Sequence, residues 1–121
     1  MRTALITAIA LVAIAIPVAG TTASAGTTAS STVVKPVVVS VTAVNGRPVG
    51  GIKRPTVKKG QIVRIVVRTN VGNQVHLHGY NIEKKVTKGV PTVIQFVAKV
   101  QGRFELELHP LDALLAQLTV K

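Results

Sequence analysis

Residues 37–120 repeat one pattern, in which short runs rich in Val, Ile and Thr are separated by Gly, Asn and Pro. The clearest run is 61–69, where Val63, Ile65 and Val67 alternate with other residues over the length of one strand. Branched side chains of this kind favour a pleated sheet over a helix. Because no stretch has the period of an amphipathic helix, the pattern predicts an all-β fold.

Turn residues divide this region into about seven short strands at roughly eight-to-twelve-residue spacing. The strongest turn signal is Asn45-Gly46, because both residues tolerate positive φ. We expect strands over 74–81 and 103–108, a basic loop over 84–89, and a loop or short helical turn over 111–116 before a last short strand. Strands spaced in this way predict an antiparallel β-sandwich or barrel.

Residues 1–25 have the parts of a secretory signal peptide: a positive start, an apolar run and the small-residue motif Ala23-Ser24-Ala25. The apolar run is shorter than the ~20 residues that span a bilayer as a helix. We therefore expect export to the periplasm or the extracellular space after cleavage near Ala25, with no transmembrane segment in the mature chain. The Thr-, Ser- and Gly-rich residues 26–36 predict a flexible spacer, which leaves 37–121 as the folded domain.

The chain is strongly basic, with 15 Lys and Arg against four Asp and Glu and a net charge of +11. The basic residues are scattered, which indicates a solvated surface; the alternative is attraction to an anionic cell-envelope polymer. Nucleic-acid binding is not expected, because Tyr80 is the only aromatic residue expected on an exposed face for base stacking and the chain is expected to be exported. The absence of cysteine excludes disulfides and thiolate metal sites.

Two of the three histidines and the only tyrosine lie within residues 75–80. Side chains at positions i and i+2 of a strand share a face, so we expect His76, His78 and Tyr80 to point to one side. Two imidazoles at this spacing can reach one metal ion above the strand. A stable site needs a third ligand, for which His109 is the candidate.

The motifs His78-Gly79-Tyr80 and Gly102-x-Phe104-x-Leu106 resemble those of the cupredoxin family, and the resemblance extends over the whole of the expected domain. It implies a Greek-key β-sandwich with a copper site at one end.

The family ligands are not all present. The resemblance places Leu108 where the ligand cysteine is expected, and residues 110–115 contain neither His nor Met. A blue-copper site requires the thiolate, so a conventional blue-copper electron carrier is excluded. What can remain is a site of two or three histidines, for which copper is favoured over zinc.

The position of His109 relative to the pair is open. If the strand over 103–108 continues regularly, His109 points outward with Glu105 and Glu107, and only a bend at the following proline brings it to the pair. The two glutamates are interpreted as solvated or ion-paired with basic neighbours. Asp112 is a candidate fourth ligand, a partner of His109 or a loop cap.

Two functions are compatible with these features. The first is an exported binding protein that holds copper through His76, His78 and His109 and works with a redox or envelope protein partner. The second is a metal-free structural or interaction module that uses its basic surface. The chain contains no catalytic motif, and we do not expect an enzyme.

Overall fold

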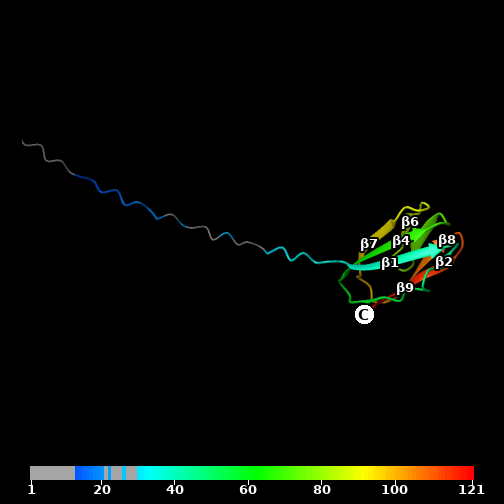
Figure 1. The fold of residues 1–121 in the computed structure, drawn as a ribbon. Helices are drawn as coiled ribbons and strands as arrows, with labels where there is room; N and C mark the ends of the chain where they lie inside the picture. Colours follow the sequence, from blue (N-terminus) through cyan, green and yellow to red (C-terminus); the bar gives the residue numbers. More distant parts are fainter. Residues whose placement is uncertain (1–12, 21, 23–25, 27–29) are drawn as a thin grey trace, which may run out of the picture. The chain divides into compact units, whose positions relative to one another are not determined.

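The computed structural model describes residues 13–20, 22, 26 and 30–121, and this part of the chain contains nine β-strands (Figure 1). Seven strands have four or more residues and two have only two residues. The number of longer strands matches the expected seven, although one of them, over residues 82–85, was not expected. The strands are β1 (Val37–Val44), β2 (Arg47–Pro48), β3 (Thr56–Val57), β4 (Ile62–Thr69), β5 (Gln74–Leu77), β6 (Ile82–Lys85), β7 (Thr92–Val97), β8 (Gly102–His109) and β9 (Ala113–Val120).

The strands form two sheets that pack into a sandwich. The four-stranded sheet has the order β2-β1-β4-β7, and the five-stranded sheet has the order β3-β9-β8-β5-β6. In Figure 1, β1, β4 and β7 run together through one layer, while β8 and β9 belong to the other. The all-β sandwich is therefore confirmed. The expectation of purely antiparallel sheets is wrong, because β1 pairs with β4 and β3 with β9 in parallel.

The core lies between the two sheets and is aliphatic. On β4 the alternation predicted from the sequence is confirmed, since Val63, Ile65 and Val67 are all buried. On β8, Leu106 and Leu108 are buried in the same way. This alternation fixes the direction of every other side chain on these strands, because a one-residue shift would expose the whole apolar set.

Asn45-Gly46 forms the predicted tight turn between β1 and β2. Val44 pairs with Arg47 across a two-residue loop. Asn45 and Gly46 have φ of 50° and 78°, the positive values that this turn requires.

Two segments differ from the sequence-based expectation. The first of the basic residues expected to form a loop over 84–89 lie instead at the end of β6. This strand is at the edge of its sheet, where lysines are suitable because their charge opposes pairing with another chain. The expected loop or helical turn over 111–116 is correct only for residues 111 and 112, which form a turn, because residues 113–116 belong to the eight-residue strand β9. Pairing with β8 and burial of Leu115 and Leu118 outweigh the weak local signal there.

Tyr80 does not share a face with the histidines, contrary to expectation. β5 ends at Leu77, and Gly79, with φ of 80°, redirects the chain. The Tyr80 ring packs against Phe96 and Phe104, with ring centroids 4.6 Å from each. Phe96 belongs to one sheet and Phe104 to the other, so Tyr80 closes the space between the sheets.

The predicted signal peptide and spacer lie partly outside the described residues, because 1–12, 21, 23–25 and 27–29, including the cleavage motif, are not described. Both remain predictions. Residues 30–35 are exposed and belong to no strand. Among the residues described, no helix is long and apolar enough to cross a bilayer.

Candidate metal centre

His76 and His78 lie on the outer face of the five-stranded sheet. Val75 and Leu77 of the same segment are fully buried, so the alternating side chain of His76 points away from the core. His78 follows directly after β5, and its backbone N–H donates to the carbonyl of Glu105 at 2.9 Å. The His76 and His78 rings lie side by side, with centroids 4.2 Å apart.

His109, the last residue of β8, lies on the same outer face. The antiparallel register pairs Gln74 with His109 and His76 with Glu107, while Leu108 between them faces the core. The expected outward direction of His109 is therefore correct. The inference that this direction separates it from the histidine pair is wrong, because the pair itself faces outward.

The three histidines form one cluster. A ring nitrogen from each of His76, His78 and His109 lies within 4.8 Å of the others. The His109 ring centroid is 5.9 Å from that of His76. Two nitrogens that bind one ion at about 2.0–2.1 Å are at most about 4.2 Å apart. Side-chain rotations that bring each pair of nitrogens within this limit therefore allow the cluster to hold a metal ion.

His76 contributes a buried nitrogen that has no hydrogen-bond partner among the described residues. Its Nε2 is buried, and the nearest carboxylate oxygen, Oε1 of Glu83, is 4.0 Å away, which is too far for a hydrogen bond. Buried polar atoms nearly always have a partner. An ion bound by the cluster would supply the missing partner for this lone pair, so the donor set fits a metal.

Asp112 holds the ring of His109. Its Oδ1 lies 2.9 Å from Nδ1 of His109, within the turn between β8 and β9. When Nδ1–H donates to this carboxylate, the lone pair of Nε2 is left free for a metal, an arrangement typical of histidine ligands. Of the three roles left open for Asp112, the geometry supports that of a partner of His109.

Glu107 contacts two of the three histidines through one oxygen. Its Oε2 lies 2.9 Å from Nε2 of His78 and 4.0 Å from Nε2 of His109. The interpretation of Glu107 as ion-paired agrees with these contacts, but its partners are histidines, since no Lys or Arg among the described residues lies within 4.0 Å of its carboxylate.

All four acidic residues of the chain lie around this cluster. Glu83 on β6 and Glu107 on β8 flank His76 as its two cross-strand partners. Asp112 bonds to His109, and Glu105 precedes Glu107 by two positions on the same face. Glu105 accepts a hydrogen bond of 3.2 Å from Gln117, not from a basic residue.

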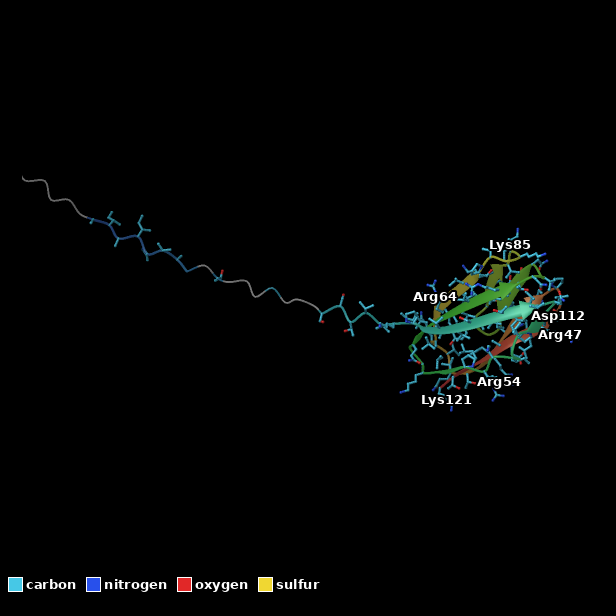
Figure 2. All side chains as sticks on the ribbon, viewed as in Figure 1. Arg47, Arg54, Arg64, Lys85, Asp112 and Lys121 are labelled. Atoms are coloured by element: carbon cyan, nitrogen blue, oxygen red, sulfur yellow. The ribbon has the colours of Figure 1, made fainter. Side chains whose placement is uncertain are left out.

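The basic residues surround the domain without joining these carboxylates. Figure 2 labels Arg47, Arg54, Arg64, Lys85 and Lys121 around its periphery. In the described part of the chain, each acid–base contact within 4.0 Å involves a histidine, and none involves Lys or Arg. The carboxylates are therefore concentrated on the one part of the surface that carries imidazoles.

The cluster does not lie where the family resemblance implied a site. Leu108, in the place of the expected cysteine, is fully buried and faces the core. His109 follows it and faces outward. The histidines therefore lie on the outer face of the five-stranded sheet, whereas the resemblance implied a copper site at one end of the sandwich.

Sequence reasoning missed Glu107 and Glu83 as neighbours of the histidines. The signal for Glu107 was present, because the alternation that buries Leu108 also puts Glu107 and His109 on one face. The burial of Val75 puts His76 on an outer face in the same way. Glu83 gave no signal, because β6 was not predicted as a strand.

No known sequence family matches the chain, and no curated protein matches it in sequence. Solved structures do match in fold. One is a copper binding protein determined by NMR in its apo form, with 15% identity and a TM-score of 0.57 over 69% of this chain and 86% of that chain. Another is the metal binding domain of the Cu(I) exporting P-type ATPase CopA of Streptococcus pneumoniae D39, with 16% identity and a TM-score of 0.57 over 69% and 84% of the two chains.

A third match is a chain of a heme-copper terminal oxidase dimer, with 16% identity and a TM-score of 0.54 over 69% of this chain and 64% of that one. At these identities the similarity concerns the fold alone. It confirms the predicted cupredoxin-like sandwich.

Proposed function

We propose that this chain is an exported cupredoxin-like binding protein that holds a copper ion through His76, His78 and His109. It handles the ion outside the membrane together with a redox or envelope partner and catalyses no reaction by itself. When bound, copper supplies a redox-active centre. The protein supplies three imidazoles on a rigid sheet, and Asp112 orients one of them.

The observation that carries this proposal is the convergence of the three histidines, one of which, His76, has a buried Nε2 with no hydrogen-bond partner among the described residues. Neutral imidazole is a good ligand for copper, zinc and nickel, and among divalent ions a given site binds Cu(II) most tightly. The carboxylates around the cluster support the proposal, because they offset the repulsion that a basic protein exerts on a cation.

Calorimetric titration with Cu(II) tests the proposal. The material is residues 32–121, a compact unit that contains every described strand and the whole described core. We expect one ion to bind. We expect His78→Ala to weaken binding by more than the roughly 10–100-fold that loss of an orienting partner costs.

A relocated histidine provides the matched control. Gln95 is exposed on β7, in the other sheet. The double variant His78→Ala/Gln95→His keeps three imidazoles but not the cluster, and we expect it to bind as weakly as His78→Ala. Equal, weak binding by the parent and by both variants would end the proposal.

A second candidate function is supported by the opposite sheet. Arg64 and Arg68 are exposed on the outer face of β4, and no acidic side chain lies on that sheet. This face suits an anionic envelope polymer. Retention on such a polymer should weaken as salt rises. At low salt, Arg64→Ser/Arg68→Ser should be retained less than Arg54→Ser/Arg103→Ser, which removes the same charge elsewhere. Retention that is independent of salt concentration and equal in the two variants would exclude this second function.

A further inference from the structure

Glu107 lies beside the histidine cluster, next to His78 and His109. It is the direct cross-strand partner of His76, and its Oε2 faces Nε2 of His78 at 2.9 Å and Nε2 of His109 at 4.0 Å. We infer that Glu107 is the fourth ligand of the metal centre, and that its oxygen makes the site selective for divalent ions such as Cu(II) over Cu(I). This inference rests on the proposed function.

The other carboxylates are less suited to this role. Asp112 is engaged with Nδ1 of His109 and is 78% exposed. Glu83 is 55% exposed and 4.0 Å from His76 alone. Glu105 bonds to Gln117. Glu107, at 22% exposure, alone among the four acidic residues lies within 4.0 Å of two histidines.

The position of Oε2 also fits the chemistry of ligand exchange. In the structure Oε2 of Glu107 and Nε2 of His78 form a hydrogen bond, with the proton between them. An ion that binds both atoms takes the place of this proton. In a neutral ring the proton moves to Nδ1, and only a doubly protonated ring releases one to solvent. The carboxylate then needs no new position on the sheet, because β8 already holds it beside both rings.

Selectivity follows from the kind of donor. Thiolate and thioether ligands select Cu(I), whereas carboxylates suit harder ions. The chain has no cysteine, and its only methionine is Met1. Three imidazoles and one carboxylate give an N₃O set whose negative charge stabilises a divalent ion more than a monovalent one.

The test compares Glu107→Gln with the matched control Glu105→Gln in residues 32–121. Glu105 lies on the same strand and face but contacts no histidine within 4.0 Å. Affinities for Cu(II) in air and for Cu(I) under anaerobic conditions are measured by competition with chelators. Electron paramagnetic resonance of the Cu(II) form reports on the ligand set directly.

We expect Glu107→Gln to bind Cu(II) at least about tenfold more weakly than the parent and to keep the Cu(I) affinity of the parent. Its resonance spectrum should differ from that of the parent. Glu105→Gln should match the parent in both affinities and in the spectrum. An unchanged spectrum and affinity in Glu107→Gln would overturn the inference. Tighter Cu(II) binding would overturn it too, since Glu107 would then compete with the metal. In both cases the parent still binds, so the proposed function survives; a parent that binds no Cu(II) ends both.

Discussion

His76 and Glu107 are direct cross-strand partners, one on β5 and the other on β8. Directly opposed residues of an antiparallel pair have Cβ atoms about 4.5–5.5 Å apart. The sheet therefore fixes the separation of the two Cβ atoms before any ion is present. A site built on paired strands is more precise than one built on loops.

Removal of the Asp112 carboxylate should weaken metal binding without removing a ligand. Asp112→Asn keeps the shape of the side chain but no longer favours the tautomer with the proton on Nδ1 of His109. We expect Cu(II) affinity to fall about 10–100-fold. Nitrogen-15 NMR of the His109 ring reports the tautomer. An altered affinity with an unchanged tautomer would contradict this explanation.

Metal binding should stabilise the fold. An ion that binds only the native state adds about 2.7 kcal/mol at a free concentration of 100 times Kd, which raises Tm on the order of 10 °C for a domain of this size. Thermal unfolding of residues 32–121 with and without Cu(II), monitored by circular dichroism, measures the shift. A variant with all three histidines replaced by alanine should show none, and a shift of equal size there would indicate binding elsewhere.

A cysteine at position 108 should not create a blue-copper centre. Leu108 is fully buried and points away from the histidines, so Leu108→Cys places its thiol in the core. His109→Cys instead puts the thiol beside His76 and His78. We expect intense visible thiolate-to-copper absorption only from His109→Cys. The reverse result would mean that the core side of β8 carries the site.

Gly79→Ala should destabilise the domain more than Gly89→Ala. Both glycines have positive φ, of 80° and 74°, but a Cβ at Gly79 would collide with the Phe104 ring, whereas nothing lies within 4 Å of one at Gly89. We expect a loss of about 1 kcal/mol for Gly89→Ala and about 2–4 kcal/mol for Gly79→Ala, where overpacking is added to strain. Urea denaturation of the two variants measures the difference, and equal losses would contradict the role of Phe104.

Much of the fold could be predicted because alternation is a local signal. The buried faces of β4 and β8 follow from Val63, Ile65, Leu106 and Leu108, and the first hairpin follows from Asn45-Gly46. The parallel pairing of β1 with β4 could not be predicted in this way, because the sequence of a strand does not indicate which other strand it pairs with. The extent of β9 likewise depends on its pairing with β8.

The histidine cluster was predicted in composition but not in position. His76, His78 and His109 were correctly selected as neighbours, yet the face they share was not recognised. The burial of Val75 and Leu77 decides that face, and it becomes evident only when the strand is placed in a sheet. Tyr80 was misplaced because a single glycine, Gly79, ends the two-residue period that its assignment assumed.

The concentration of carboxylates beside the histidines also gives the molecule an electrical polarity. Glu83, Glu105 and Glu107 mark one outer face of the sandwich, while Arg64 and Arg68 stand on the outer face of the other sheet. Near a negatively charged surface, such a molecule turns its arginines toward that surface and its histidines toward the solvent. Adsorption would then orient the protein so that its imidazoles remain accessible to ions and molecules in the solvent.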